Sequence, residues 1–459
     1  MLILQKYLNF FYLLCREHYE LKKFRELSAT SQFSKQRNEA LQLQKLNALL
    51  NHAYKHVPYY KNVFKESDLL IDGVFELTSL NQITALPFLR KSIIRDQQYN
   101  LHSDDHNSRN SFINRSGGST GEPLYFLQDK LYNINNIANF HLVKSWRGAT
   151  PYDSEITIWG APRDTFGDTK PISEKLKDFC RNRIVLNSFK MSSQDMHHYI
   201  ELINNHKPQI IVTYAQSIYE LAIFAKEHNI PIKKQHAIHT AASTLYPYMR
   251  EAIKSVFKCE VFDHYGCRET GAIASECSEH NGLHIMMDHT LVEVINSSGQ
   301  PAKTGEQGEI VITTLDNFSM PLIRYKMSDI AIMQEYKLCS CGCTYPKLQE
   351  VVGRTTDMFK TMSGDVITPI FFKFLLGVRC NHGYIESYQV IQEALDLIII
   401  KIVKHGDIPK EDLELLEEKI KVVMGDTCKI RFEFVEHIAK TETGKFLYTI
   451  SKLSNKEER

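Results

Sequence analysis

The sequence predicts an α/β protein with a large N-terminal body and a small α+β domain at the C-terminal end. Three observations support this prediction. Short apolar strands alternate with helical stretches over residues 110–270, the pattern becomes all-β over 284–335, and strands with one amphipathic helix follow Gly353. Because strands that alternate with helices pair in parallel, the first pattern indicates an α/β sheet. We expect a large domain over 1–356 and a small domain over 357–459.

The N-terminal segment, about residues 1–66, predicts helices that end near the breaker at Pro58. Its first part is apolar at helical spacing, through Leu4, Tyr7, Leu8, Phe11 and Leu14. Lys6 interrupts this stretch, which is too short to span a bilayer, and no small-residue cleavage site follows it. The prediction is an amphipathic helix packed on the body, and contact with a membrane surface is the alternative.

The central region supplies the strands and helices of the expected sheet. Strands are predicted where β-branched and aromatic residues cluster, at 156–160, 183–187 and 209–215. Helices are predicted where apolar residues recur every three or four positions, at 191–206 and 217–229.

The last third of the chain changes character twice. A β-rich part over about 277–350 has strands separated by Gly- and Pro-bearing turns. In the C-terminal domain, strands are predicted at 386–393 and 395–403, a helix at 409–425 and a further strand at 428–437. These elements together predict the small α+β domain.

The amino-acid composition excludes some classes of protein. The 459 residues carry 55 Lys and Arg against 54 Asp and Glu, a formal net charge of +1, with 21 Gly and 14 Pro. A charge this small removes bulk attraction to nucleic acid or acidic membranes. Ten cysteines in so long a chain do not form a disulfide framework. We expect a globular cytoplasmic protein with no nucleic-acid partner and no membrane span.

A glycine-rich loop is the most informative stretch of the chain. Residues 116–121 read Ser-Gly-Gly-Ser-Thr-Gly, which offers close backbone approach and hydroxyl donors to phosphate oxygens. The loop is neither a Walker A loop nor a dinucleotide fingerprint. It fits G-x-S-x-G around Ser119, but a nucleophile elbow needs a helix after the turn, and Glu122-Pro123 and a β-favouring Leu-Tyr-Phe follow. We predict a phosphate-binding loop, with a Ser119 hydrolase and a purely structural turn as alternatives.

This loop and four further stretches, in the same order, resemble the adenylate-forming (acyl-AMP-making) enzymes. The four are Tyr265–Gly271 (Tyr-Gly-x-x-Glu), Met320–Asp329 (P-L-I-R-Y-x-x-G-D), Val352–Asp357 (the hinge) and Thr441–Lys445. The resemblance is closest to the branch of phenylacetate–coenzyme A ligases and CapK-like capsule-biosynthesis proteins. VPYYKNVF (57–64) and LPFLRKSII (86–94) fit this branch too. The similarity covers roughly residues 50–450.

The resemblance implies a body of several subdomains and a small mobile C-terminal domain that pivots at Asp357. It also implies an enzyme that activates a carboxylate with ATP and Mg²⁺, forms AMP, and passes the acyl group to a thiol, with coenzyme A as the expected acceptor. The residues implied to be catalytic are Lys445, Glu269 and Thr120. Lys445 would bridge the carboxylate and the α-phosphate, and Glu269 would bind Mg²⁺, which prefers oxygen ligands.

Further residues are implied to hold the nucleotide. Tyr265 would flank adenine, Asp329 would accept hydrogen bonds from the ribose hydroxyls, and Arg354 would reach the ribose or the α-phosphate. The implied nucleotide-binding residues are Ser116, Gly117, Gly118, Ser119, Thr120, Gly121, Ala242, Ser243, His264, Tyr265, Gly266, Asp329 and Arg354.

Three departures from the family pattern leave the acyl and acceptor preference open. Ser243 stands where the family often has Glu, Ser328 stands where it has Gly, and Phe446 follows Lys445 where a basic residue is commonly near. Arg324 lies in the P-L-I-R-Y motif but could equally serve as a structural ion-pair partner, so it is not assigned to the site.

A cysteine-rich stretch, Cys339-Ser340-Cys341-Gly342-Cys343, together with Cys277 and His284 offers four or five soft ligands. Thiolates and imidazole in tetrahedral sets select Zn²⁺. The spacing is unlike a zinc finger, so reduced thiols without a metal are the alternative, and the resemblance to the branch adds support for zinc. The predicted ligands of a structural zinc are Cys277, His284, Cys339 and Cys341, with Cys343 as the alternate.

The acid-binding pocket is expected between residues 130–160 and 210–265. Aromatic and imidazole side chains there are Tyr132, Phe140, Trp146, Trp159, Tyr214 and His264. Aromatics would suit an apolar or aromatic acid, although a core role is the more common one for such residues. The expected partner is a small carboxylic acid, and polysaccharide-assembly enzymes and a homodimer stay open.

Three functions are compatible with these motifs. The leading hypothesis is an AMP-forming acid–thiol ligase of the phenylacetate–coenzyme A ligase type. A second passes the acyl group to an amine or a sugar during capsular or surface polysaccharide biosynthesis. A third is a non-catalytic nucleotide-binding homologue, which the changes at Ser243 and Ser328 motivate.

Overall fold

A computed structural model describes most of the chain. The described residues are 18–116, 124–159, 172–188, 191–354, 359–363, 366–367, 371–372, 375–376, 384–404, 406–439 and 447–453. The predicted helix before residue 18 lies outside them. The chain divides into two compact units: a larger unit of residues 1–327 and 332–350, and a smaller unit of 328–331 and 351–459.

An 11-stranded sheet organises the fold, with the strand order β12-β13-β14-β15-β11-β10-β9-β8-β7-β5-β6. Its parallel part joins β6, β5, β7, β8 and β9, and the pairs β9–β10, β10–β11, β11–β15 and β12–β13 are antiparallel. The bounds are β5 (Glu155–Trp159), β6 (Arg183–Asn187), β7 (Ile210–Tyr214), β8 (Ala237–Ala241), β9 (Glu260–Cys267), β10 (Gly271–Ser275), β11 (Leu283–Ile285), β12 (Thr290–Ile295), β13 (Gln307–Thr314), β14 (Tyr325–Met333) and β15 (Lys347–Arg354).

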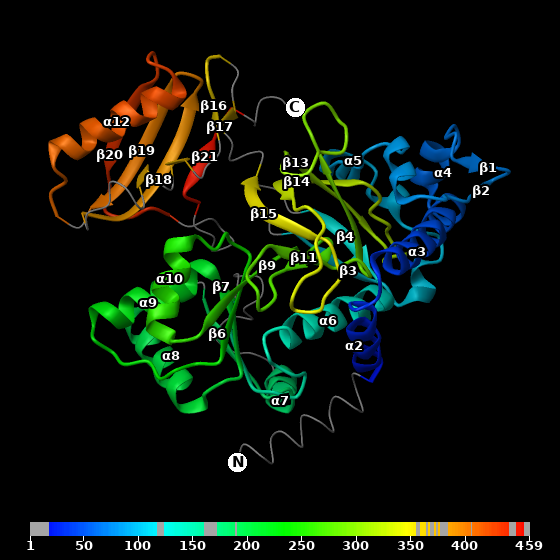
Figure 1. The fold of residues 1–459 in the computed structure, drawn as a ribbon, viewed down its shortest axis with the longest axis horizontal. Coiled ribbons are helices and arrows are strands. Elements are labelled where there is room, and N and C mark those ends of the chain that lie inside the picture. The colour runs from blue at the N-terminus through cyan, green and yellow to red at the C-terminus, as the bar shows by residue number, and fades with distance from the viewer. Residues whose placement is uncertain are drawn as a thin grey trace. The chain divides into compact units, whose positions relative to one another are not determined.

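Helices cover the parallel strands, as the alternating pattern predicts. Figure 1 shows α8, α9 and α10 together beside β6 and β7. These helices are α8 (Ser193–His206), α9 (Ala215–Glu227) and α10 (Pro247–Phe257), and α7 is Ile172–Cys180. Ile253 and Phe257 of α10 and Leu221 of α9 are fully buried, so the helices bury an apolar stripe.

The N-terminal helices pack on the same unit. α2 (His18–Thr30) packs against α6 (Lys130–Ser145), and Leu27, Leu142 and Tyr345 share one core cluster. α3 (Lys35–His56) is fixed by Gln42, whose amide donates to the carbonyls of Met287 and Thr290. The shorter elements that follow are α4 (Pro58–Phe64), β1 (Leu70–Ile71), β2 (Val74–Phe75), α5 (Lys91–Asp96), β3 (Phe112–Arg115) and β4 (Tyr125–Gln128).

The smaller unit has its own sheet, with the order β20-β19-β18-β21, and α12 lies along it (Figure 1). Its elements are β16 (Phe359–Lys360), β17 (Val366–Ile367), β18 (Ile385–Ala394), β19 (Leu397–Lys404), α12 (Lys410–Met424), β20 (Lys429–Phe434) and β21 (Thr449–Ser451). Leu416 and Ile420 of α12 pack on Ile398 and Ile400 of β19, and all four side chains are fully buried. This α+β arrangement agrees with the sequence pattern.

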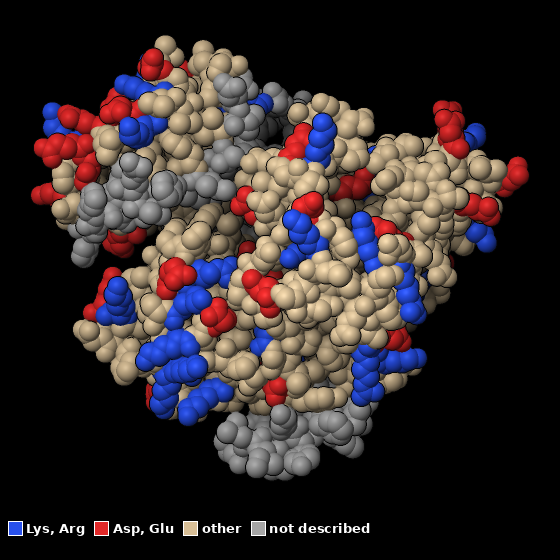
Figure 2. Space-filling view, viewed as in Figure 1, with Lys and Arg blue, Asp and Glu red and all other residues tan. Residues whose placement is uncertain are grey.

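Charge is mixed over the surface. Figure 2 shows Lys and Arg side chains and Asp and Glu side chains spread over the same face, in keeping with a net charge of +1. Among the described residues, no helix has the length and apolar character needed to cross a bilayer.

Candidate active site

The glycine-rich loop lies between two antiparallel strands, β3 and β4, with Arg115 opposite Tyr125. At the base of the loop, Ser116 N–H donates to the Leu124 carbonyl at 2.8 Å, and Leu124 N–H donates to the Ser116 hydroxyl at 2.9 Å. Residues outside the described part include Gly117, Gly118, Ser119, Thr120 and Gly121. Because a strand and not a helix follows the loop, the flanks contradict the nucleophile elbow of a Ser119 hydrolase.

The hairpin that carries this loop is joined to the turn that carries Glu269. Gln128, the last residue of β4, donates from its amide to the Arg268 carbonyl at 2.7 Å and accepts from the Asn114 amide at 2.9 Å. Gln128 is buried, so these bonds are protected from water. The strands that flank the glycine-rich loop are therefore joined to the turn that carries Glu269.

Two glycines shape the turn at Glu269. β9 and β10 form a hairpin in which Gly266 pairs with Ala272. A Cβ at Gly266 would lie 2.5 Å from the Gly271 carbonyl oxygen, and a Cβ at Gly271 would lie 2.4 Å from Asn136 Oδ1. Gly271 also has a φ of +71°, which L side chains rarely adopt. The Tyr-Gly-x-x-Glu-x-Gly spacing thus places Glu269 at the tip of a tight hairpin.

The buried His289 holds the same hairpin in place. His289 Nδ1 lies 2.6 Å from Asp316 Oδ2, and its Nε2 lies 2.9 Å from the Thr270 carbonyl oxygen. Asn135 of α6 donates to the same Asp316 carboxylate at 2.8 Å. His289 and Asp316 position the turn, and no local sequence pattern marked either residue.

The P-L-I-R-Y motif is held by two segments from the N-terminal region. The Tyr60 hydroxyl donates to the Pro321 carbonyl at 2.9 Å and accepts from Ile323 N–H at 3.1 Å. Leu89 N–H donates to the Arg324 carbonyl at 3.0 Å. The stretches 57–64 and 86–94, which fit the same branch in sequence, therefore contact a motif more than 200 residues away.

Arg324 is a structural residue. Its guanidinium binds both carboxylate oxygens of Glu293, at 2.8 and 3.1 Å, and donates to the carbonyls of Thr84 and Leu86. It also lies over the Phe88 ring at 4.2 Å. The ion-pair role that the sequence left open is the observed one.

The predicted ribose residue follows an unusual backbone position. Asp329, in β14, is 8% exposed. Ser328 before it has a φ of +63°, in the left-handed region that favours glycine. Glycine adopts this left-handed conformation without strain, which explains why it suits the motif at this position. Ser328 adopts the left-handed conformation here.

The end of β8 shows a second left-handed residue. Ala242 has a φ of +63°, and the buried Ser243 hydroxyl has no hydrogen-bond partner among the residues that the structure describes. Both ring nitrogens of the buried His264 of β9 likewise lack a described partner, and the next residue, Tyr265, pairs with Ala274 in the sheet. The predicted adenine-contact residues therefore lie at the ends of adjacent strands, because β8 and β9 are parallel neighbours.

Three predicted residues lie partly or wholly outside the described residues. Arg354 ends β15, and its side chain is not among those described. The pivot Asp357 and the catalytic Lys445 lie outside as well. Their roles stay predictions.

The predicted zinc ligands lie together in the larger unit. The ligand atoms of all four side chains lie within 4.8 Å of one another; they are Cys277, His284, Cys339 and Cys341. Cys277 Sγ and Cys339 Sγ are 3.8 Å apart, and Cys341 Sγ is 3.5 Å from His284 Nε2. His284 Nδ1 lies 2.9 Å from the Tyr345 carbonyl, which fixes the ring with Nε2 directed at the thiols.

The two other candidates near this cluster have different surroundings. Cys343 is not in the group; it is buried in an apolar cluster, and this burial raises the pKa of its thiol. His280 lies 3.3 Å from both Glu276 and Glu260. Lys347 Nζ donates to Cys339 Sγ at 3.8 Å.

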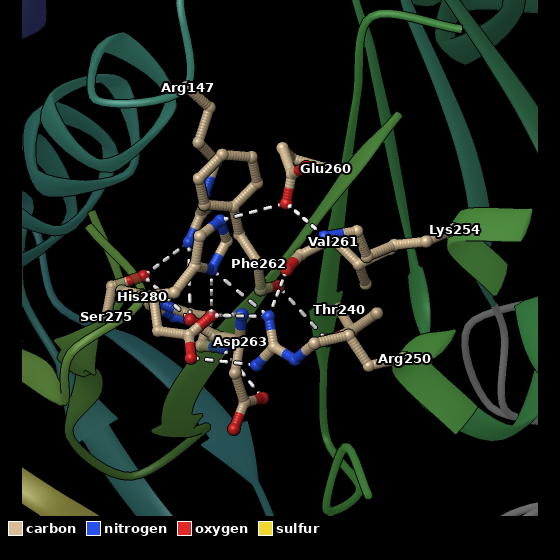
Figure 3. Close-up of polar contacts among 12 residues, drawn as sticks. Arg147, Thr240, Arg250, Lys254, Glu260, Val261, Phe262, Asp263, Ser275 and His280 are labelled. Atoms are coloured by element: carbon tan, nitrogen blue, oxygen red, sulfur yellow. Dashed lines mark hydrogen bonds and ion pairs between the residues drawn. The ribbon is translucent and has the colours of Figure 1, made fainter. Parts of the chain in front are cut away.

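A buried arginine beside the sheet was missed by sequence reasoning. Arg147 follows α6 and is 3% exposed; Nη1 contacts His239 Nδ1, and Nη2 donates to the Ser275 hydroxyl. Its guanidinium lies 5.2 Å from the Phe262 ring (Figure 3). Burial lowers the pKa of Arg147 to about 9. No motif or local pattern in the sequence pointed to it.

Arg147 Nη2 also donates to the Asp263 carbonyl at 3.3 Å, and Asp263 and Arg250 belong to a neighbouring group of charged side chains (Figure 3). Arg250 forms a bidentate pair with Glu276 at 2.8 and 3.1 Å, and Asp263 N–H donates to Glu276 at 2.7 Å. Burial and the neighbouring Glu276 raise the pKa of Asp263 to about 7. These groups fix β9 against α10.

The aromatic candidates for the acid pocket separate into two groups. Trp146 packs on His284 at 5.5 Å and Tyr132 on His289 at 5.3 Å, so these two belong to the framework. Trp159, Tyr214 and His264 lie on parallel strands, and Phe140 of α6 packs on His264 at 5.2 Å. Trp159 and Tyr214 have ring centroids 4.2 Å apart at the ends of β5 and β7.

Comparisons with known proteins agree with the motifs. Residues 360–452 match the family model "CapK C-terminal domain". Protein CapK of Staphylococcus aureus is 24% identical over 95% of this chain and 93% of its own length. The phenylacetate–coenzyme A ligase of Thermus thermophilus is 26% identical over 70% of this chain and 71% of its own.

A solved structure shows the same fold. The 2-hydroxyisobutyryl-CoA ligase in its postadenylation state, in complex with 2-HIB-AMP, has a TM-score of 0.71 at 19% identity and covers 93% of this chain and 92% of its own. An open form of that ligase with 2-HIB-AMP and CoA has a TM-score of 0.60 at 18% identity, covering 92% of each chain. The chain is therefore a relative of CapK and the phenylacetate–coenzyme A ligases with the fold of adenylate-forming coenzyme A ligases, which confirms both the resemblance and the α/β fold class.

Proposed function

We propose that this protein is an AMP-forming ligase that activates a carboxylic acid with ATP and passes the acyl group to a thiol, coenzyme A. The observation that carries the proposal is the junction made by Gln128, which joins the hairpin of the glycine-rich loop to the Glu269 turn. The likeness to phenylacetate–coenzyme A ligases and to a ligase solved with an acyl-AMP and CoA supports the same chemistry.

The reaction assigns a task to each motif. The acid carboxylate attacks the α-phosphorus of ATP, the bond to the bridging oxygen breaks, and pyrophosphate leaves with that electron pair. Ser116, Ser119 and Thr120 would bind the departing phosphates, and Glu269 would hold Mg²⁺, which neutralises charge on the phosphate oxygens. Asp329 would bind the ribose, and Lys445 would stabilise the charge that develops between carboxylate and α-phosphate.

Pyrophosphate–ATP exchange over a panel of aryl, hydroxy and amino acids tests the proposal. We expect acid-dependent exchange that falls by ~10²-fold or more in Lys445→Ala and in Glu269→Gln, because each removes a group that stabilises transition-state charge. Lys452→Ala is the matched control, since Lys452 pairs with Glu393 in the same unit. Folded protein that exchanges with no acid would refute the assignment.

The acceptor has a competing assignment. The likeness to CapK over 95% of the chain favours transfer to an amine or a sugar in capsular or surface polysaccharide biosynthesis. Mass spectrometry of the product with and without coenzyme A separates the two, because strict coenzyme A dependence supports the thiol. If Lys445→Ala leaves every activity intact, the non-catalytic nucleotide-binding homologue is favoured.

We also propose a structural zinc held by Cys277, His284, Cys339 and Cys341. Tetrahedral sulfur ligands at a Zn–S distance of about 2.3 Å lie about 3.8 Å apart, and the Cys277–Cys339 sulfur separation is 3.8 Å. Four protein ligands leave no open position, so the metal would tie the end of β10 to the segment before β15. Elemental analysis of protein purified without chelator should find about one zinc per chain, and its absence would contradict the proposal.

A further inference from the structure

The carboxyl ends of four parallel strands place a row of side chains on one face of the sheet. The rings of Trp159 and Tyr214 are 4.2 Å apart, and Tyr214 pairs with Ala241 at the end of β8. His264 comes one residue after Asp263, which pairs with Thr240, so it continues the row on β9. In open α/β sheets, ligands bind outside these strand ends. The row therefore lies where the acid of the proposed reaction is expected.

Two imidazoles occupy this face at close range. The ring centroids of His239 and His264 are 4.9 Å apart, and Phe140 of α6 lies 5.2 Å from His264. Both histidines are buried, and burial together with the nearby Arg147 lowers the pKa of His264 to about 3 and that of His239 well below 6.5. Both rings are therefore neutral at pH 7.

The protonation of His239 follows from its neighbour. Arg147 Nη1 contacts His239 Nδ1, and a guanidinium can only donate. His239 Nδ1 is therefore the acceptor nitrogen, and the proton of the neutral ring lies on Nε2. That Nε2–H is buried and has no hydrogen-bond partner among the described residues.

His264 and Arg147 add further unpartnered groups. Within the part of the chain that the structure describes, neither nitrogen of His264 has a partner, and a neutral ring offers one donor and one acceptor. Arg147 Nε is also buried and unpartnered, and Arg147 forms no ion pair with a carboxylate of the described residues. The cluster thus holds three unused N–H donors, one unused acceptor and one buried positive charge.

Unused buried donors are unfavourable unless something accepts from them. An all-hydrocarbon acid, such as an unsubstituted aryl or alkyl acid, would leave all three unsatisfied. An oxygen atom on the substrate would accept from them, and Arg147 favours an oxygen with negative charge or a strong dipole.

Resting on the proposed function, we propose that His239, His264 and Arg147 select an oxygen-bearing acid. The substrate class is a carboxylic acid whose distal part carries a hydroxy, oxo or second carboxylate group. His264 and His239 act as specificity-determining residues that contact this oxygen, and Trp159 and Tyr214 pack against the carbon skeleton beside it.

The test compares matched acids in pyrophosphate–ATP exchange: phenylacetate with 4-hydroxyphenylacetate, pentanoate with 4-oxopentanoate, and hexanoate with the six-carbon dicarboxylate. We expect at least one oxygen-bearing partner to exceed its hydrocarbon counterpart by ~10-fold or more in kcat/KM, since the site would otherwise keep unpaired donors. Equal or better activity with all hydrocarbon acids would overturn the inference while leaving the proposed ligase intact.

Substitutions test which residues cause the preference for oxygen-bearing acids. His264→Leu should reduce the ratio towards one by raising KM for the oxygen-bearing acid, and His264→Gln, which keeps a donor and an acceptor, should retain part of it. His141→Leu is the matched control, because His141 is also buried with two unpartnered nitrogens but packs on Phe24 of α2. A ratio that is unchanged in His264→Leu, or lost equally in His141→Leu, contradicts the assignment.

A binding measurement separates this inference from the ligase activity. In wild-type protein with ¹⁵N-labelled histidine, the preferred oxygen-bearing acid should shift the ring signals of His239 and His264, and its hydrocarbon counterpart should not. If no acid supports exchange but this contrast is seen, the proposed function fails and the inference stands. If exchange is seen without the contrast, the inference fails alone.

Discussion

Arg324 and Glu293 form a bidentate ion pair in which Nη2 and Nε of the arginine lie 2.8 and 3.1 Å from the two carboxylate oxygens. Arg324 has a φ of +50°, and its other guanidinium nitrogen donates to the Thr84 and Leu86 carbonyls. One side chain therefore ties β12 to the N-terminal region behind the P-L-I-R-Y motif. Its task is to hold the motif's backbone in place.

Arg324→Ala should lower the free energy of unfolding by about 3–5 kcal/mol, because it leaves the buried Glu293 carboxylate unpaired. Arg324→Lys should recover only part of this, since an ammonium cannot reproduce the fork of hydrogen bonds. Urea unfolding followed by circular dichroism measures both changes. A loss below about 1 kcal/mol in Arg324→Ala would show that the pair has no structural role.

Gly271→Ala should destabilise the protein and move Glu269. The residue combines a positive φ with a Cβ position 2.4 Å from Asn136 Oδ1. Gly299→Ala is the matched control, because Gly299 has a φ of +77° with nothing within 4 Å of its Cβ position. We expect a loss of about 1–2 kcal/mol at Gly299 from backbone strain alone and a larger loss at Gly271.

Acid-dependent pyrophosphate–ATP exchange should also distinguish Gly271→Ala from Gly299→Ala. Gly271→Ala should lose it, and Gly299→Ala should keep it. Equal stability losses at the two positions would mean that the close approach to Asn136 relaxes at little cost.

Stability should fall as the pH drops below 6.5. Burial lowers the pKa of His141 and of His264 to about 3, from an ordinary value of 6.5. Between these values the unfolded chain binds protons that the native protein does not, so the free energy of unfolding rises with pH there. Each group contributes about 2 kcal/mol of lost stability at pH 5 relative to neutral pH.

His141→Leu tests this, since it removes one such group. The decrease in unfolding free energy between pH 7.5 and pH 5.0 should be about 2 kcal/mol smaller in the variant than in the wild type. Identical decreases in the two proteins would show that His141 takes up its proton in the native state.

Cys277→Ser should abolish zinc binding and lower the melting temperature. The change removes one of four ligands, and metal-binding free energy contributes to folding. Cys343→Ser is the control, because Cys343 lies in an apolar cluster outside the ligand group. Elemental analysis should find zinc in Cys343→Ser and none in Cys277→Ser. The reverse result would make Cys343 a ligand in place of Cys277.

Local periodicity predicted most of the elements. The strand expected at 183–187 is β6 (Arg183–Asn187), and the helix expected at 191–206 is α8 (Ser193–His206), which begins at the Ser192 cap. The strand–loop–strand arrangement around the glycine-rich loop also followed from a proline and β-favouring residues after it. These features depend on residues close in sequence, which is why they could be predicted.

Features that depend on long-range contacts could not be derived in this way. The parallel strands and the β-rich part form one 11-stranded sheet. They are joined through the β9–β10–β11 pairings, which no local pattern specifies. The roles of His289 and Asp316 depend on a contact between segments 27 residues apart. Arg147 gave no signal because its partners, His239 and Ser275, are 92 and 128 residues away.

The hydroxyl of Tyr60 has a consequence for how the chain can be shortened. By donating to Pro321 and accepting from Ile323, it satisfies two buried peptide groups of the P-L-I-R-Y motif. A version that starts after Phe64 would strip those groups of their partner and open a hollow the size of a phenol ring. The N-terminal helices therefore support the interior of the larger unit. Removing them is expected to cause aggregation and not to give a smaller active protein.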